Sequence, residues 1–426
     1  MLKSLKKRKN EKFMSENNSN IVTNPLKYTC MFGGGAVRGM AYIGAIRALE
    51  ELNVEFDIIA GSSVGSIFAA LVACGYKSYE LENIFMKVNF ELFKDIHLGI
   101  GKPFAISRGE IFIDWLNELI SRKFPEKKKN KLTFEDLEKE LVIFSTDLRK
   151  FKNYEFSKNN SQYFEIARAI RISSSMPGLM PPYEYNGRSL VDGDLQKGSP
   201  MWDSSETLKN TTSRILEFRL EGDYSSAEKN PISFINTIYS CVTSIATDFM
   251  VSLYGQNDRY DIININTGDI FFADLNLNEE GRKKLIDIGY QVTMDYFKTV
   301  LPPKKEGLLN VYSQVLKFLK EAQKGLKINN VEEVQWWFGD LFMILCENKD
   351  LVDPCIYNKI IELKQRMMDS VTTMLFFHAK FKDYKELIIL MDEVIEMVKC
   401  RLTEIELFIS VNRTPEEQVA EAIVNG

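Results

Sequence analysis

The stretch EFDIIAGSSVGSIFAAL, Glu55–Leu71, places an apolar run and a helix-like run on either side of a short turn. The first run has the length and composition of a buried strand, and it stops at Gly61. The turn, GSSVG, matches the G-x-S-x-G pattern, in which a strained strand-to-helix connection exposes the central serine, here Ser63. Gly61 and Gly65 flank that serine, where a side chain would collide with neighbouring backbone. Because small residues are common at such turns, a simple packing turn is the alternative interpretation.

A second strand–turn–helix unit lies immediately upstream, in KYTCMF, GGGAVRG and MAYIGAIRALEELN, residues 27–53. Two such units in succession are typical of a parallel α/β sheet. The glycine-rich turn stands at the start of the predicted helix. Its amide N–H groups can therefore converge on an anion. A dinucleotide-binding turn is disfavoured, because G-x-G-x-x-G fits neither from Gly33 nor from Gly34 and no Walker lysine follows.

A serine hydroxyl becomes a useful nucleophile only when a base takes its proton. Asp192, in SLVDGD, is the candidate base, because it ends a short apolar run and Gly193 permits a sharp turn beside it. A carboxylate can act in this way in a water-poor site that raises its basicity. The alternative is a Ser–Asp–His arrangement with His378, but that histidine lies in an apolar helical stretch where packing is the favoured role. The other histidine, His97, has no distinguishing context.

The composition limits the class of protein. The chain has 426 residues and a net charge of -5, which argues against a surface devoted to nucleic acid. Its six cysteines include no C-x-x-C pair and its two histidines are far apart, so a disulfide framework and a zinc site are disfavoured. No apolar run reaches the ~18 residues of a spanning helix, and the N-terminal residues lack the apolar region of a secretory signal. We therefore expect a cytoplasmic protein; peripheral membrane contact and secretion as an effector stay open.

The patterning divides the chain into three parts. Residues 1–26 are basic and polar, which predicts a disordered tail or, alternatively, a segment attracted to anionic lipid. Residues 27–302 alternate strand and helix patterns, including a long helix at residues 231–254. The string LPPKKEG, residues 301–307, is expected to break the pattern, and only helical periodicity follows from residue 308 to residue 423. The boundary is placed near residue 303, which makes residues 303–426 a helical C-terminal domain.

Taken together and in order, several strings resemble the patatin-like phospholipase family, in its bacterial branch. They are GGGAVRGMAYIGAIRALEE, FDIIAGSSVGSIFAAL, FSTDL, ARAIRISSSMPGLMPPYEYNGRSLVDGD and NEEGRKKLIDIGY. The resemblance spans about residues 27–300 and implies a three-layer α/β/α domain with a mainly parallel central sheet, followed here by an all-α C-terminal region. It also implies a lipid acyl hydrolase with a Ser–Asp dyad, which uses no histidine, metal or other cofactor.

Carried over to this sequence, the resemblance implies that Ser63 is the nucleophile that forms an acyl-enzyme and that Asp192 is the general base. It implies an oxyanion hole made by the backbone of the glycine-rich turn and supported by the arginine that follows, at Gly34, Gly35, Ala36 and Arg38. The remaining motif positions, which shape the turns around these groups, are Gly33, Gly39, Gly61, Gly65, Gly193 and Asp194. The string SSSMPGLMPP resembles the segment that frames the acyl pocket.

Two positions depart from the pattern of this family. Ala36 stands where the family has a glycine, and alanine costs about 1 kcal/mol or more if the position requires a positive φ. Asp194 stands where the family has glycine or alanine, which puts a second carboxylate near Asp192. Two nearby carboxylates raise one another's pKa, which would tune the base.

These observations predict a serine acyl hydrolase of the phospholipase A or lysophospholipase type, acting on phospholipid or lysophospholipid in a membrane. Transfer of the acyl group to another alcohol is an alternative that the residues do not separate from hydrolysis. The alternative from a different class is a weakly active scaffold whose helical tail binds a protein partner or activator, which Ala36 and Asp194 support. None of these readings involves nucleic acid or a metal.

Overall fold

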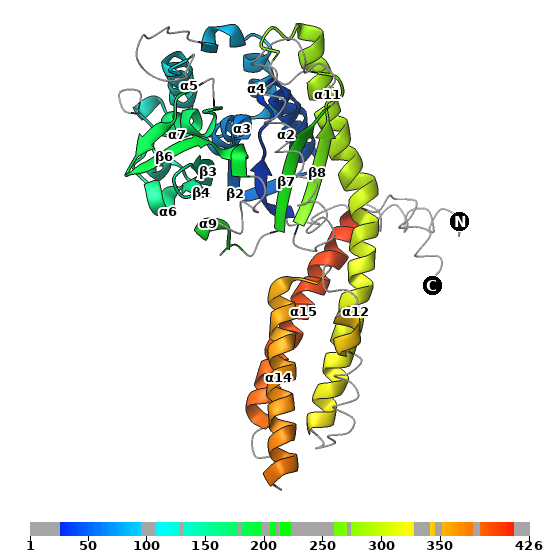
Figure 1. Cartoon of the computed structure of the whole chain (residues 1–426). Helices are drawn as coiled ribbons and strands as arrows, with labels where there is room; N and C mark the ends of the chain where they lie inside the picture. The colour runs from blue at the N-terminus through cyan, green and yellow to red at the C-terminus, as the bar shows by residue number, and fades with distance from the viewer. Residues whose placement is uncertain are drawn as a thin grey trace, which may run out of the picture.

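The computed structural model describes residues 26–94, 107–127, 131–177, 180–196, 205–209, 211, 214–222, 260–270, 274–327, 341–345, 352–377 and 384–412. Several predictions lie outside these ranges, namely the N-terminal tail, the helix at residues 231–254 and any role of His97 or His378. Figure 1 shows a domain built on a sheet, from which a group of long helices extends.

Within the described ranges, eight strands form one sheet. They are β1 Leu26–Phe32, β2 Val54–Ser62, β3 Glu140–Asp147, β4 Lys152–Phe156, β5 Tyr183–Tyr185, β6 Arg188–Asp192, β7 Arg214–Glu221 and β8 Tyr260–Asn266. The order is β5-β6-β3-β2-β1-β7-β8, and β4 also pairs with β3. Strands β3, β2, β1, β7 and β8 run parallel, whereas the pairs β3–β4, β3–β6 and β5–β6 are antiparallel. The prediction of a mainly parallel central sheet is confirmed.

Helices connect and cover the strands (Figure 1). The helices of the sheet domain are α2 Ala41–Glu51, α3 Val64–Ala73, α4 Ser78–Phe85, α5 Glu110–Lys123, α6 Lys158–Ser161, α7 Ile166–Ser173, α9 Glu206–Lys209 and α11 Glu279–Asp295. Short 3-10 turns include η1 Ala36–Met40, η2 Phe90–Lys94 and η5 Gly193–Gln196. Helical crossovers are what parallel strands require, because a tight hairpin can join only antiparallel ones.

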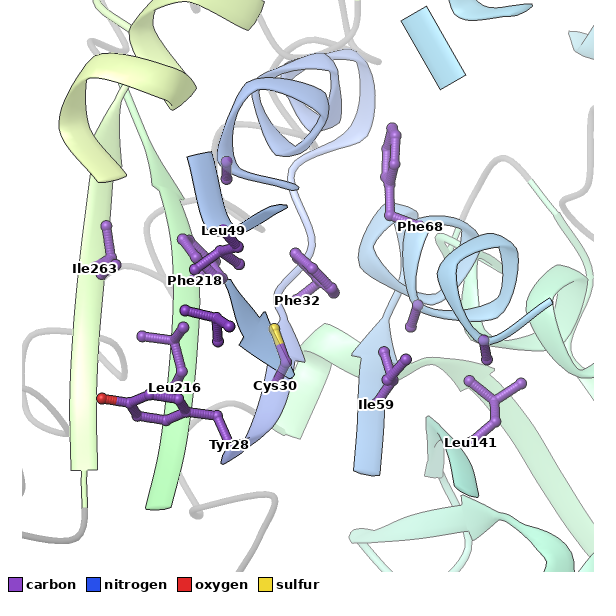
Figure 2. Packing of buried hydrophobic residues seen from close by; sticks show 14 of the residues in the cluster. Tyr28, Cys30, Phe32, Leu49, Ile59, Phe68, Leu141, Leu216, Phe218 and Ile263 are labelled. Atoms are coloured by element: carbon purple, nitrogen blue, oxygen red, sulfur yellow. The ribbon is translucent and has the colours of Figure 1, made fainter. Parts of the chain in front are cut away.

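Both faces of the sheet are buried. On β1, Tyr28, Cys30 and Phe32 point into the larger apolar cluster, to which α2 and α3 also contribute (Figure 2). Met31 points to the opposite face, where a smaller cluster includes Phe144 of β3. Because successive side chains of a strand point to opposite faces, burial of both sets makes the sheet a central layer.

Helices α2 and α11 approach each other closely enough for their backbones to touch. A Cβ atom added at Gly44 would lie 1.8 Å from the carbonyl oxygen of Ile286, and one added at Gly289 would lie 1.9 Å from that of Ala41. Only glycine leaves room at these two positions. The pair therefore fixes α11 against the first α/β unit.

The expected break at residues 301–307 is wrong. The path of α11 continues through a π turn, Tyr296–Val300, into α12, Leu301–Lys327 (Figure 1). Pro302 and Pro303 lie in the first turn of α12, directly after the π turn, where the altered hydrogen-bond pattern accommodates residues that lack a backbone N–H. The prolines begin a new helical segment in line with the old one.

Helix α12 packs against α15, Tyr384–Asn412, which also packs against α14, Pro354–Phe377 (Figure 1). The buried apolar residues of α12 and α15 recur at spacings of three and four, as in other packed amphipathic helices. They include Leu308, Val311, Val315, Leu319, Leu387, Leu390, Val394 and Val398. No helix among the described residues combines the length and apolar character needed to cross a membrane.

Helix α12 begins at the end of the sheet opposite the GSSVG turn, where the parallel strands start. The Lys304 ammonium group of α12 donates to the carbonyl of Tyr260, the first residue of β8, at 2.7 Å. Ser62 is the last residue of β2, and β2 and β8 point the same way. The start of α12 therefore lies at the amino edge of the sheet, whereas Ser63 lies at the carboxyl edge.

A buried ion cluster joins α12 to the sheet. Asp261 of β8 accepts hydrogen bonds from Arg214 at 2.6 Å and from the Tyr296 hydroxyl at 2.9 Å, and it forms an ion pair with Lys304 at 3.3 Å. Burial alone would raise the pKa of Asp261, but Arg214, Lys304 and Lys305 outweigh that effect and hold the pKa well below its usual range. The carboxylate stays charged and anchors the helix.

The segment MPGLMPPYEYNGRSLVDGD, residues 176–194, is called the Pro-rich segment here, and it contains two strands although proline and glycine are typical of turns. Strands β5 and β6 form a hairpin around Asn186 and Gly187, whose φ values are 47° and 73°. Positive φ at two successive residues is the requirement of a type I′ turn, and Asn-Gly is its preferred sequence. The Asn-Gly pair is therefore the sequence signal by which this hairpin could have been predicted.

Candidate active site

The GSSVG turn joins β2 to α3 with Ser63 at its apex. Ser63 has φ 49° and ψ -129°, a conformation that non-glycine residues rarely adopt. A Cβ atom added at Gly65 would lie 2.0 Å from the carbonyl oxygen of Phe32, and one added at Gly61 would lie 2.4 Å from that of Gly65. The two glycines let the turn press against β1, and this packing holds Ser63 in its strained geometry.

The structure brings Ser63 and Asp192 together. The Ser63 hydroxyl donates to Asp192 Oδ2 at 2.8 Å, and both residues are buried, at 8% and 0% exposure. The other carboxylate oxygen, Oδ1, accepts the backbone N–H of Asp194 at 2.9 Å. The Asp192 side chain is thus held from both sides, with one oxygen on the backbone and one on the serine.

The glycine-rich turn lies beside this pair. Its backbone has a positive φ at Ala36, the conformation in which alanine is less stable than glycine. Ala36 has φ 49°, and Gly35 has φ 155°. The Gly34 N–H donates to Asp194 Oδ1 at 3.1 Å, so that amide already has an acceptor. Among the hydrogen bonds of the described residues, none uses the N–H of Gly35 or Ala36. These two amides are therefore candidate donors to a ligand.

Two side chains hold the glycine-rich turn from outside. The buried Arg38 donates through Nε to the carbonyl of Ile270 at 2.8 Å. The Tyr42 hydroxyl donates to the carbonyl of Gly33 at 2.7 Å. Burial, together with nearby carboxylates, raises the pKa of Tyr42 well above its ordinary value, so the hydroxyl remains a donor.

Several serines near Ser63 were not assigned a role from the sequence. The Ser63 N–H donates to Ser173 Oγ at 2.9 Å, and that hydroxyl donates in turn to the carbonyl of Phe144. The Ser66 hydroxyl donates to the Ser63 carbonyl at 2.6 Å. Ser173 belongs to the string SSSMPGLMPP, so the signal lay in a segment that the sequence linked only to the pocket.

A cavity of about 890 Å³, including its open mouth, begins at Ser63 and Asp192. Its walls carry a group of aromatic rings from α3, α4, η2 and α5, namely Phe68, Phe85, Phe90, Phe93, Phe112 and Trp115. Met176 and Met180, from the Pro-rich segment, also line it, as the resemblance implied for that segment. Apolar walls that converge on a few polar groups are the usual form of a ligand site. Among the residues whose side chains the structure describes, none from α12, α14 or α15 lines this cavity.

The Pro-rich segment owes its shape to a buried arginine. Arg171 of α7 donates to the carbonyls of Arg108 and Pro181 and to the Ser175 hydroxyl, at 3.0 to 3.3 Å. Its guanidinium group thereby links the start of α5 to both ends of the segment that carries Met176 and Met180. This linkage positions one wall of the cavity.

Comparison with known proteins agrees with this architecture. The family model described as patatin-like phospholipase matches residues 30–202. An uncharacterised Bacillus subtilis protein, YqhO, is 25% identical over 293 residues, which cover 63% of this chain and 97% of that protein. The lysophospholipase NTE1 of Candida glabrata is 28% identical over 180 residues, covering 40% of this chain and 9% of that protein.

Two further comparisons extend the range of relatives. The probable lipid hydrolase 463L of invertebrate iridescent virus 6 is 25% identical over 180 residues, covering 41% of this chain and 61% of that protein. Among solved structures, VipD from Legionella pneumophila has a TM-score of 0.46 and 14% identity, covering 92% of this chain and 93% of that one. The patatin-like phospholipase match, together with the lysophospholipase and the probable lipid hydrolase, supports a lipid acyl hydrolase. Residues 30–202 form the part of the chain that matches the patatin-like phospholipase family.

Proposed function

We propose that this protein hydrolyses fatty-acyl esters of phospholipid or lysophospholipid through a Ser63–Asp192 dyad. The observation that carries the proposal is the 2.8 Å hydrogen bond from the Ser63 hydroxyl to Asp192, at the end of an aromatic cavity. The cavity suits an acyl chain, because its walls are apolar and its polar groups gather where an ester would lie.

In the first half of the reaction, Ser63 Oγ attacks the ester carbonyl carbon while Asp192 takes the hydroxyl proton. The negative charge that develops on the carbonyl oxygen is stabilised by the N–H groups of Gly35 and Ala36. The bond from the carbonyl carbon to the alcohol oxygen then breaks, and Asp192 returns its proton to that oxygen. The acyl group remains on Ser63.

In the second half, water attacks the acyl-enzyme. Asp192 accepts a proton from the water, the bond from the acyl carbon to Ser63 Oγ breaks, and the serine regains a proton from Asp192. A free fatty acid leaves the cavity. If another alcohol takes the place of water, the same steps transfer the acyl group, and the product analysis distinguishes the two reactions.

The substrates of this class reside in membranes, so the mouth of the cavity must meet a bilayer surface. Helix α12 begins at the opposite edge of the sheet, and no described side chain of α12, α14 or α15 lines the cavity. A role as a lid is therefore disfavoured for the described part of these helices, and binding of a protein partner or activator at a distance from Ser63 is the role we favour.

Fatty-acid release from mixed phospholipid and lysophospholipid vesicles tests the proposal. Wild type should release fatty acid, Ser63→Ala and Asp192→Asn should not, and His378→Ala should remain active. A fluorophosphonate probe should label wild type but not Ser63→Ala. Activity in Ser63→Ala equal to that of wild type would refute the dyad, and an inactive, unlabelled wild type would favour the scaffold alternative.

A further inference from the structure

The side chain of Asp194 connects the glycine-rich turn to the serine turn. Asp194 is 3% exposed, and its Oδ1 accepts the Gly34 N–H at 3.1 Å. The same oxygen accepts the hydroxyl of Ser62, the residue that precedes the proposed nucleophile. One carboxylate oxygen therefore joins two backbone segments that must keep a fixed separation for the proposed chemistry.

The fit around this carboxylate is close. A Cβ atom added at Gly34 would lie 1.8 Å from Asp194 Oδ2, so the side chain fills the space that glycine leaves. The backbone just before Asp194 is also confined, because a Cβ atom added at Gly193 would lie 2.3 Å from the carbonyl oxygen of Phe144. The Asp194 side chain has little freedom to take another position.

The contact of Asp194 with the proposed base is separate from this bridge. Asp192 Oδ1 accepts the backbone N–H of Asp194, which any residue at the position except proline would supply. A change of the Asp194 side chain therefore leaves the support of Asp192 in place. The effect of the side chain on the glycine-rich turn can be measured by itself.

The glycine-rich turn needs an external restraint. Ala36 holds a left-handed φ of 49°, which an alanine side chain disfavours, and its N–H is one of the two proposed oxyanion donors. The Gly34 N–H, two residues earlier, is bonded to Asp194 and so serves as an anchor. Without that anchor, the turn can relax and move the donors away from Ser63.

We propose that Asp194 is a positioning residue, whose carboxylate clamps the oxyanion turn to the serine turn through Gly34 and Ser62. This inference rests on the proposed function, since it concerns the donors for that reaction. Gly34 then serves as an anchor of the turn and not as an oxyanion donor. The carboxylate of Asp194, at a position where the family has glycine or alanine, is the acceptor for that anchor.

Two variants of Asp194 separate the effect of its hydrogen bonds from the effect of its negative charge. Asp194→Asn keeps an oxygen that can accept both hydrogen bonds, whereas Asp194→Ala removes the acceptor. We expect Asp194→Ala to lose about 10- to 100-fold in kcat with KM within about twofold, because a displaced donor acts on the transition state alone. Asp194→Asn should stay within about threefold of wild type in both constants.

Hydrogen exchange gives a second readout that does not require turnover. The amides of residues 33–39 should exchange about tenfold faster in Asp194→Ala than in wild type, and at the wild-type rate in Asp194→Asn. Ser62→Ala removes one partner of the bridge, and adding it to Asp194→Ala should cost little more than Asp194→Ala alone. Hydrogen exchange in α11 should be unchanged in all of these variants, which excludes global unfolding as the cause.

The outcomes distinguish this inference from the proposed function. Loss of activity in Ser63→Ala, together with full activity and unchanged exchange in Asp194→Ala, would refute the clamp and leave the dyad intact. An increase of kcat in Asp194→Ala would also refute it, because the carboxylate would then obstruct Gly34. If wild type is inactive, the exchange measurement still decides whether Asp194 holds the turn.

Discussion

The hydroxyl of Ser63 lies 2.8 Å from a carboxylate oxygen of Asp192, although 129 positions separate the two residues in the chain. Ser63 follows β2, and Asp192 ends β6, which is antiparallel to β3. Strand β3 lies between β2 and β6, and on it Ser62 pairs with Phe144 and Asp192 pairs with Ser145, so the two strand ends lie side by side. The proposed dyad is therefore a product of strand order and register.

Replacement of Asp192 by asparagine should lower kcat by about 10³-fold, because the amide cannot take the Ser63 proton. Fatty-acid release from lysophospholipid micelles measures the effect. Asp287→Asn, a loss of charge on the exposed face of α11, is the matched control and should behave as wild type. A comparable loss in both variants would mean that net charge, not the base, governs activity.

Ala36→Gly should stabilise the protein by about 0.5 to 1 kcal/mol. Glycine removes the strain of the left-handed φ, and its greater freedom in the unfolded chain offsets part of the gain. Chemical denaturation measures the free energy of unfolding. Ala48→Gly, inside α2, should instead destabilise by about 1 kcal/mol or more, since that position is helical and buried. Equal signs for the two variants would contradict the assigned conformation of Ala36.

Ile67→Phe should shorten the acyl chains that the enzyme accepts. Ile67 lines the cavity from α3, one turn after Ser63, so a larger side chain there should exclude long chains. We expect kcat/KM for a long-chain ester to fall at least tenfold relative to a butyryl ester, within the usual range for steric discrimination in apolar pockets. Labelling by a small fluorophosphonate should proceed at the wild-type rate. A uniform loss on both esters would indicate damage to the dyad instead.

The Asp261 cluster should make stability depend on acid. Because ion pairing holds the pKa of Asp261 below its unfolded value, its contribution is complete above about pH 4 and is lost as pH falls toward the folded pKa. Asp261→Asn should lower the free energy of unfolding by about 3 kcal/mol near pH 7, because Arg214 and Lys304 lose their buried partner. Denaturation between pH 3 and pH 7 should show a smaller acid dependence in the variant. An identical pH slope would remove Asp261 from the explanation.

Gly289→Ala should destabilise the protein by about 1 to 3 kcal/mol, because the new methyl group would overlap the Ala41 carbonyl and push α11 from α2. Gly307→Ala is the matched control. It lies in α12 with nothing near the added Cβ position, so it should stabilise by about 1 kcal/mol through helix propensity. Thermal unfolding distinguishes the two signs, and a destabilising Gly307→Ala would contradict the helical path described for α12.

Local patterns predicted the elements near Ser63 well. The runs before and after GSSVG form β2 and α3, and the upstream unit at residues 27–53 forms β1 and α2. The pattern failed at positions 301–307, because two prolines are compatible with the first turn of a new helix as well as with a break. It also overlooked β5, whose three residues are too short to show a period.

The sequence by itself determined the two strand–turn–helix units and the choice of Ser63 and Asp192 as candidates, because glycine placement and apolar periodicity act over a few residues. Only the tertiary structure decided that Asp194 bonds to Gly34 and Ser62, that Ala36 has a positive φ, and that α12 leaves from the edge opposite Ser63. These relations depend on packing around a turn and on contacts between residues 44 to 160 positions apart in the chain. Such relations are set by the packing of the whole domain, and no short stretch of sequence encodes them.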